Sequence, residues 1–491
     1  MRGVATAVVV GAVAALGGCA INPVTGEREL ALLSEEQEIA LGRESAEQVA
    51  RAMAGVENAE LEGYVAEIGG GLAATSERPD LPWQFGIVDD PTPNAFALPG
   101  GFIFVTRGLL GLLRSEAELA AVLGHEIGHV TARHSVTQIS RQQLAQLGLG
   151  IGMAVSPELA RLGDLAGAGL NLLFLKHGRD DERQADELGF RYMLEQGYDV
   201  REMDDVFVAL EAAGELAGQS PLPTWLASHP SEPERIAAVQ ERIASLPQGQ
   251  TGGRVEAERY LRAIDGLTYG EDPRNGYFDD GMFYHPELAF QFAVPADWRR
   301  QNLASVVVAA SEAGDAALEL SIVANATPEQ ATQRFASERS VELLGSSEER
   351  LNGNRAIVSR FRAAAQNGVV AGYVAHIDHG GATYRLVAYA PESRIQARAP
   401  LLEDIVESFA PLRDPERLEV EPRRIAIVAL EEAMTFEEFT RRYPSTVAAE
   451  ELAVLNHVQD PGAELAPGTL LKRVVGGPGR GGGPGASEGR R

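Results

Sequence analysis

Cysteine and lysine are almost absent from this chain of 491 residues. Its one cysteine, Cys19, has no partner for a disulfide within the chain. Lysine occurs only at Lys176 and Lys472, and 70 acidic residues against 43 basic ones give a formal net charge of −27. Because nucleic acid and anionic lipid headgroups repel so acidic a protein, the composition opposes electrostatic binding to either. Attachment to a membrane would need another device.

Long apolar runs are also scarce. The run from Val4 to Leu16 is shorter than the roughly 20 residues that span a bilayer. It follows Arg2 and ends in small residues before Cys19, an order that resembles a bacterial lipoprotein signal, cleaved before the cysteine to which lipid is then attached. Ala20 replaces the Asp that retains such proteins at the inner membrane, so the resemblance favours an outer-membrane anchor facing the periplasm. The alternative is an ordinary signal peptide or short anchor with an incidental cysteine.

Residues 125–129 have the H-E-x-x-H pattern, inside an apolar-periodic segment. Ser115 opens a capping-box pattern, which predicts that a helix begins there. Residues four apart share a helix face, so His125 and His129 can present two imidazole nitrogens to one metal ion. Glu126 lies beside that face, where a carboxylate can act as a general base on water without being a ligand. The alternative is a plain helix with two packed or solvated histidines.

A catalytic zinc site usually takes three protein ligands and leaves one position for water. The acidic segment 179–189 supplies Glu182 and, one helical turn later, Asp186. Glu182 is the natural third ligand. Asp186, on the same helix face, can accept the remaining ring N–H of a ligand histidine and so fix its orientation.

Three sequence blocks now carry a family resemblance. They are residues 94–101 (Asn-Ala-Phe-Ala-Leu-Pro-Gly-Gly), the H-E-x-x-H block, and the E-x-x-A-D block at 182–186. In this order and spacing they resemble peptidase family M48, which includes HtpX-like, BepA-like and LoiP-like bacterial zinc peptidases. The likeness covers about residues 20–245. It implies a zinc endopeptidase with one Zn²⁺ per chain, held by His125, His129 and Glu182, with Glu126 as the base.

Apolar residues alternate with a period of two at residues 84–88 and 102–105, which predicts two strands. Between them, the stretch Asn94-Ala95-Phe96-Ala97 is expected to be extended and near the site. An exposed strand edge beside a metal can bind a substrate backbone as an added strand. The alternative is a packed core strand without substrate contact.

His229 precedes a proline in a segment, residues 226–236, that resembles a part of BepA-like relatives close to the metal. The resemblance implies either a displaceable fourth ligand or a donor to the oxyanion of the reaction intermediate. A turn or capping role is the alternative. We expect the remaining histidines to be structural or exposed, because they show no partner spacing: His134, His177, His285, His376, His379 and His457.

The stretch between the two ligand helices, residues 144–175, is rich in Leu, Ala and Gly but is interrupted by Pro157, Glu158 and Asp164. Neither of its apolar runs reaches the length of a membrane span. We therefore predict two helices that cover the active-site cleft, with lateral contact to lipid left open.

The rest of the chain carries no catalytic constellation. Residues 276–412 alternate strand patterns with two helices, which predicts an α+β domain with an antiparallel sheet. Residues 420–475 predict a small βααβ fold similar to a LysM module, a family that binds glycan such as peptidoglycan, although Glu432-Ala433-Met434-Thr435 replaces its usual opening. The Gly-rich tail, residues 476–491, is expected to be disordered.

Taken together, the sequence predicts an α+β protein with a mostly helical zincin-type domain at 19–250, after a signal at 1–18. The expected function is a lipid-anchored envelope endopeptidase. The resemblance implies unfolded or misassembled envelope proteins as substrates. Two alternatives stay open: an assembly or scaffold lipoprotein with a latent metal site and a peptidoglycan-binding C-terminus, and a zinc hydrolase of a non-peptide amide.

Overall fold

The computed structural model describes residues 19–477, apart from 54, 57, 147–176, 217–224, 226–227, 230–232, 248–251, 304, 339 and 366–367. The predicted signal at 1–18, most of the predicted cover at 144–175 and nearly all of the tail at 476–491 lie outside these residues. Helices and several sheets occur together, so the predicted α+β class is confirmed. No helix in the described part of the chain is long and apolar enough to cross a membrane.

The chain divides into two compact units, one of Met1–Gly270 with Arg424–Val475 and one of Glu271–Arg423 with Gly476–Arg491. Up to Gly270, the helices of the first unit are α2 (Glu35–Ala52), α3 (Ala59–Ala73), α4 (Arg107–Leu112), α5 (Glu116–Thr131), α6 (His134–Gln146), α8 (Arg179–Glu195), α9 (Glu202–Leu216), α11 (Pro233–Ser245) and α12 (Ala257–Ala263). Its strands there are β1 (Cys19–Ile21), β2 (Arg28–Leu30), β3 (Gln84–Val88), β4 (Ala95–Leu98) and β5 (Phe102–Thr106). β1 pairs with β2, and the other three form a sheet of order β3-β5-β4.

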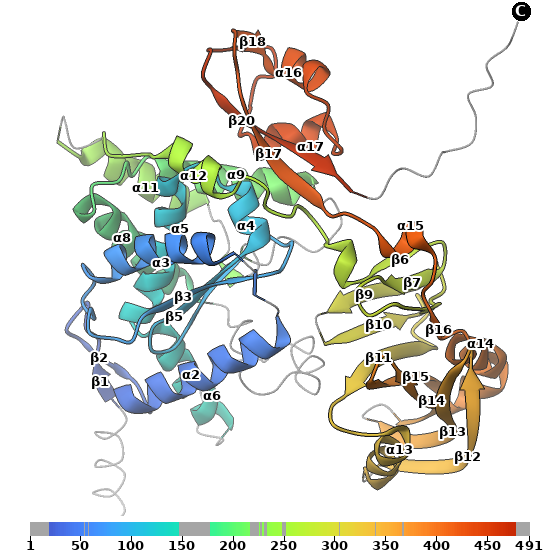
Figure 1. Cartoon of the computed structure of the whole chain (residues 1–491). Coiled ribbons are helices and arrows are strands. Elements are labelled where there is room, and N and C mark those ends of the chain that lie inside the picture. The colour runs from blue at the N-terminus through green and yellow to red at the C-terminus, as the bar shows by residue number, and fades with distance from the viewer. Residues whose placement is uncertain are drawn as a thin grey trace, which may run out of the picture. The chain divides into compact units, whose positions relative to one another are not determined.

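Helix α5 is buried along its whole length. The Ser115 hydroxyl caps its first turn by accepting a hydrogen bond from the backbone N–H of Glu118 at 3.0 Å. The buried carboxylate of Glu116 accepts hydrogen bonds from Tyr64 and Tyr198 at 2.9 and 2.8 Å. Figure 1 shows α5 in the interior, and it packs against α3, α8 and α9. The first turn of α5 is therefore fixed by hydrogen bonds, and the helix is held by neighbouring helices on several sides.

Helices α5 and α8 cross at glycines. A Cβ on Gly124 would lie 3.1 Å from the Cα of Gly189, and one on Gly189 would lie 2.9 Å from the backbone nitrogen of His125. Any side chain larger than hydrogen at this crossing would push the helices apart. The contact brings the face of α5 that carries both histidines directly against α8.

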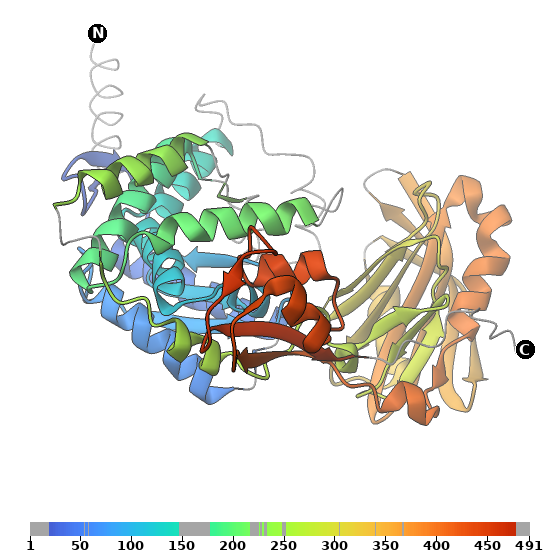
Figure 2. The ribbon, with the colours of Figure 1, turned by 90° about the horizontal axis from the view of Figure 1, so that it is seen from above.

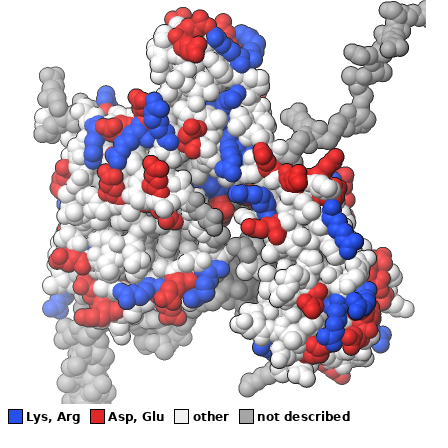
Figure 3. All heavy atoms as spheres, in the orientation of Figure 1, with Lys and Arg blue, Asp and Glu red and all other residues white. Residues whose placement is uncertain are grey.

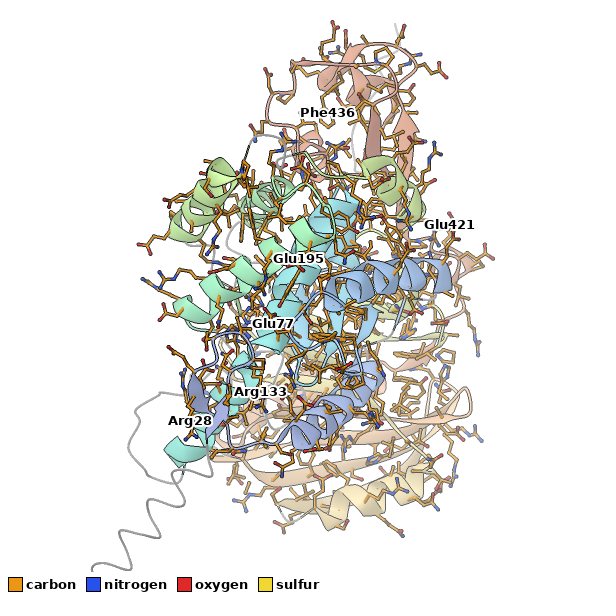
Figure 4. The ribbon with its side chains drawn as sticks, turned by 90° about the vertical axis from the view of Figure 1, so that its left-hand side faces the viewer. Arg28, Glu77, Arg133, Glu195, Glu421 and Phe436 are labelled. Atoms are coloured by element: carbon orange, nitrogen blue, oxygen red, sulfur yellow. The ribbon has the colours of Figure 1, made fainter. Side chains whose placement is uncertain are left out.

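The outer side of α8 is tied to the loop after α3. Glu77, labelled in Figure 4, accepts a hydrogen bond from the Tyr192 hydroxyl at 2.6 Å and pairs with Arg191. The stretch that follows α5 is held in a similar way, because Arg133 donates to Glu38 at 2.9 Å. Both helices of the crossing are thus anchored outside the crossing itself.

The C-terminal segment of the first unit has the predicted order of strand, helix, helix, strand, with two short strands added. Its elements are β17 (Arg423–Ala429), β18 (Met434–Thr435), α16 (Phe436–Arg442), α17 (Ala449–Leu455), β19 (Glu464–Leu465) and β20 (Leu470–Gly476). β17 pairs with β20 and β18 with β19, around a core that includes Phe436 and Phe439. Figures 1 and 2 both show this segment, in red, beside the green α9.

Lys472 of β20 attaches this segment to the remainder of its unit. Its side chain is fully buried, and its Nζ donates to the carbonyl oxygens of Gly111, Leu112 and Leu113 at 2.8, 3.0 and 2.6 Å. These carbonyls end α4, where the helix dipole favours a cation. Arg114 adds bonds to the carbonyls of Asn456 and Leu470 at 2.8 and 3.2 Å.

The second unit is built on antiparallel sheets. Its larger sheet has the order β12-β13-β14-β15-β11-β10-β9 and its smaller one the order β16-β8-β7-β6. The strands are β6 (Tyr277–Asp279), β7 (Met282–His285), β8 (Phe290–Ala293), β9 (Arg299–Leu303), β10 (Val306–Ala310), β11 (Ala317–Val323), β12 (Val341–Leu351), β13 (Asn354–Ala365), β14 (Gly368–His379), β15 (Ala382–Pro391) and β16 (Ala410–Pro411). The α-helices are α13 (Pro328–Ser337), α14 (Ile395–Glu407) and α15 (Pro415–Leu418), and the 3₁₀ helices are η2 (Pro273–Asn275) and η3 (Glu392–Arg394). The predicted strands and both predicted helices are present, whereas the long β12 to β14 were not predicted.

Charges of both signs are interspersed on the face that Figure 3 draws. Among the exposed charges of the chain, Arg183 pairs with Asp180 and Arg362 with Glu392. On that face the acidic excess is therefore dispersed, and such exposed pairs add little to stability.

Replacing Lys472 by Met is expected to loosen the C-terminal segment, because three buried carbonyls at the end of α4 would lose their donor. The cost should be about 1–3 kcal/mol. Hydrogen–deuterium exchange of peptides from residues 424–475 would measure it as several-fold faster exchange. Arg441→Met, at an exposed cation of the same segment, is the control and should leave exchange unchanged. Equal exchange in both variants would show that Lys472 does not hold the segment.

Candidate metal centre

Four side chains from three parts of the first unit converge in its interior. His125 and His129 come from α5, Glu182 from the first turn of α8, and His229 from the segment between α9 and α11; each is at most 2% exposed. The Nε2 atoms of His125 and His129 are 3.0 Å apart, and the Nδ1 of His229 lies 3.2 Å from the Nε2 of His125. The Glu182 carboxylate lies 3.5 Å from each of the first two nitrogens and 3.0 Å from His229 Nδ1. The structure therefore brings together the three residues predicted as ligands and the histidine predicted near them.

This donor set fits a zinc ion. For four ligands at about 2.0–2.1 Å from one tetrahedral ion, the expected separation between ligand atoms is about 3.4 Å. The separations given above, 3.0 to 3.5 Å, bracket that value. Three imidazole nitrogens and a carboxylate oxygen are also ligands that zinc prefers. A cation between them would satisfy lone pairs that otherwise face one another.

Hydrogen bonds orient the donors. The Nδ1 of His125 lies 2.9 Å from Asp186 Oδ1, the contact predicted from the sequence. Asp186 in turn accepts two bonds from Arg235 of α11, both of 2.8 Å, and Arg235 Nη1 also lies 2.9 Å from Glu182 Oε2. Arg235 is only 2% exposed. One guanidinium therefore positions both carboxylates.

Arg235 was not predicted to belong to the site, although it lies in the same segment as His229, residues 226–236. The available signal was the charge balance: two carboxylates buried beside a metal site need a cation within hydrogen-bond distance. Sequence spacing alone could not show which of many arginines supplies it.

His134 and His177 were expected to be structural or exposed, yet both lie against His129. The Nδ1 of His134 is 2.9 Å from the Nδ1 of His129, and its Nε2 is 2.9 Å from Gln184 Oε1. The ring of His177 lies 4.0 Å from the ring of His129, centroid to centroid. His129, His134 and His177 form a second group of close potential ligands. The i, i+5 spacing from His129 to His134 was the signal that the sequence analysis did not use.

Glu126 is 1% exposed, and its Oε1 makes no hydrogen bond to the described part of the protein. The Nε2 atom of His229 lies 3.5 Å from this oxygen, without a hydrogen bond between them. A carboxylate oxygen beside the donor cluster and without a partner is available to accept a proton.

The protonation states follow from burial and the neighbouring charges. Burial alone would lower the pKa of His125, but hydrogen bonds to Asp186 and Glu182 raise it to about 9. Burial and the adjacent His177 and His125 hold the pKa of His129 well below its usual value. Burial would raise the pKa of Glu182, yet His229 and His125 hold it well below normal. Glu182 and His129 thus already have the forms that bind metal, and His125 must release a proton.

The proposed substrate strand, Asn94 to Ala97, falls largely in β4, an edge strand of its sheet that also packs near α5. The side chains of Phe96 and Leu98 are buried against Val49. These side chains therefore belong to the hydrophobic core, while one backbone edge of β4 is unpaired within the described sheet.

Arg235→Met is expected to weaken zinc binding about 10- to 100-fold, the usual cost of losing a group that orients metal ligands. Removing a positive charge would by itself favour a cation, but it frees both carboxylates to rotate and to take up protons. Competition with a chromogenic chelator would measure the affinity. Arg242→Met on the same helix, where Arg242 pairs with the exposed Glu187, is the control. Unchanged affinity in the Arg235 variant would contradict the assigned role.

Comparison with known proteins agrees with this geometry. Residues 59–243 match peptidase family M48. The chain is 34% identical over 188 residues to the mitochondrial metalloendopeptidase OMA1 of Schizosaccharomyces pombe, covering 38% of this chain and 53% of the relative. It is 31% identical to a putative beta-barrel assembly-enhancing protease of Vibrio cholerae, in an alignment that covers 38% of this chain and 39% of the relative. It is 31% identical to the metalloprotease YcaL of Escherichia coli, in an alignment that covers 31% of this chain and 59% of the relative.

The chain thus spans between about two fifths and three fifths of the length of these relatives. The matched region contains α5, α8, α9 and α11, and with them all four converging donors. The similarity to peptidase family M48 therefore covers residues 59–243, the part of the chain that holds the donor cluster.

Proposed function

We propose that this protein is a zinc-dependent endopeptidase of the cell envelope. The observation that carries the proposal is the convergence of His125, His129 and Glu182 beside the unpartnered oxygen of Glu126. The match of residues 59–243 to a peptidase family supports the same reaction class.

His125, His129 and Glu182 would hold the metal in this proposal. Bound zinc supplies Lewis acidity and lowers the pKa of water towards neutrality. Glu126 accepts the proton of the water that attacks the peptide carbonyl, and later returns it to the leaving amine. Asp186 and Arg235 keep His125 and Glu182 in place during these transfers.

His229 would close the site at rest. Its Nδ1 lies within the donor cluster, and its Nε2 is 3.5 Å from Glu126 Oε1, so its ring fills the space between the donors and the base, where an attacking water would have to lie. Trp225 stacks on the same ring, with centroids 5.1 Å apart. Withdrawal of His229 would open one position and free Glu126. Donation to the oxyanion is the other role that the ring could take once displaced.

Cys19 is the proposed lipid anchor, in the outer membrane and facing the periplasm, and it begins β1. Unfolded or misassembled envelope proteins are the proposed substrates, and relatives named as beta-barrel assembly-enhancing proteases support this class. The unpaired edge of β4 is the candidate place for a substrate strand. Peptidoglycan is a further candidate partner, through the LysM-like segment. Cosedimentation of the intact protein with peptidoglycan would test that contact.

An assembly factor with a latent metal site is not favoured, because several relatives are named as metalloproteases or metalloendopeptidases. A hydrolase of small amides remains distinguishable by its turnover of a small amide without cleavage of an unfolded protein.

The central test measures zinc content and casein cleavage for the protein from Ala20 onward, for Glu126→Gln and for His229→Ala. We expect about one zinc per chain, and a loss of cleavage of about 10²–10⁴-fold in the Gln variant with zinc retained. His229→Ala should cleave faster, because the ring that blocks entry is gone. Chelation should abolish cleavage, and added zinc should restore it.

His285→Gln, in the second unit, is the control and should match the unchanged protein in both measurements. Zinc binding without cleavage by any variant would favour the scaffold alternative. Absence of zinc would overturn the site.

A further inference from the structure

The two histidines of α5 are oriented in different ways. His125 meets the carboxylate of Asp186, but the Nδ1 of His129 meets another imidazole, the Nδ1 of His134, at 2.9 Å. A hydrogen bond between two imidazole nitrogens contains one proton, so one ring donates and the other accepts. The direction matters because each neutral ring has a single N–H.

If His129 donates from Nδ1, its Nε2 carries a lone pair that points at the other donors. If His129 accepts at Nδ1, its Nε2 carries the hydrogen instead, and that nitrogen cannot bind a metal. The direction of one hydrogen bond therefore decides whether His129 is a ligand.

The opposite side of the His134 ring sets this direction. Its Nε2 lies 2.9 Å from Gln184 Oε1 and 3.9 Å from a carboxylate oxygen of Asp181. Both neighbours are acceptors, so the single N–H of a neutral His134 belongs on Nε2 and its Nδ1 must accept.

We propose that Gln184 and His134 are positioning residues that fix the tautomer of His129, by a relay in which His129 Nδ1–H donates to His134 Nδ1 and His134 Nε2–H donates to Gln184 Oε1. The inference rests on the proposed function, because it assumes that a metal binds at His129 Nε2.

The relay gives helix α8 three roles at alternate positions. Glu182 supplies a donor, Gln184 sets the tautomer of His129 through His134, and Asp186 sets the tautomer of His125 directly. About one turn of a single helix would then specify both α5 histidines as ligands, which agrees with the close contact between α5 and α8.

A pair of substitutions of opposite hydrogen-bonding character tests the relay. Gln184→Glu keeps an acceptor and should preserve the direction, whereas Gln184→Lys offers only donors and should reverse it. In metal-free protein labelled with ¹⁵N-histidine, the ring proton of His129 should be on Nδ1 in the unchanged and Glu forms and on Nε2 in the Lys form. Zinc affinity, by chelator competition, should fall about 10- to 100-fold in the Lys form alone.

Glu187→Lys places the same new side chain at an exposed position of α8 and should change neither measurement. Circular dichroism would show whether the Gln184→Lys variant folds. If it does not, His134→Leu, which removes the acceptor for His129, serves in its place and should also lose affinity. Equal zinc affinity and the same His129 tautomer in the Glu and Lys forms would overturn the relay. Normal zinc binding by the unchanged protein without casein cleavage would overturn the proposed function and leave the relay intact.

Discussion

The close approach of α5 to α8 is the constraint on which the metal centre depends. Gly124 and Gly189 meet with no room for a side chain between them, and a Cβ on Gly128 would lie 3.0 Å from the Cα of Ala185. Glu182 lies about one turn before Ala185, so the distance between the two helices sets how far its carboxylate reaches towards the histidines. Donor atoms that must stay about 3.4 Å apart tolerate shifts of only a fraction of an ångström.

The electrostatic cost of the centre is met locally. Beside the buried Glu126, the carboxylates of Glu182 and Asp186 and several histidines lie in a region that is almost without exposure, where an uncompensated charge costs several kcal/mol. Arg235 compensates both carboxylates, and the charge of a bound cation would complete the balance. The same low-polarity surroundings strengthen each hydrogen bond that fixes a ring, so specificity and stability come from the same contacts.

Much of this could be predicted from local sequence. Periodicity and the capping pattern at Ser115 predicted α5. Short motifs pointed to His125, His129, Glu182 and Asp186, because each pair is related by one helical turn. Arg235, His134 and Gln184 were not found. Their partners are brought to them by the crossing of helices, which no spacing along one helix reveals.

The long strands β12 to β14 were missed for a different reason. Most of β12 is exposed, as the pattern of Val341–Leu351 shows, so the apolar alternation that marks a half-buried strand is weak there. β13 and β14 do bury apolar side chains, among them Phe361 and Ile377, but charged residues, alanine and glycine interrupt their alternation.

The attachment of Lys472 has a consequence for biosynthesis. The end of α4 obtains its buried hydrogen-bond donor from a residue about 360 positions later in the chain, with residues 271–423 of the second unit in between. A nascent chain that has completed α5 and α8 still lacks this partner, so the corner from which α5 starts closes only after β20 has been made. Contacts so distant in sequence form late and slowly. A chain truncated before β20 would contain every proposed metal ligand and still leave that corner open.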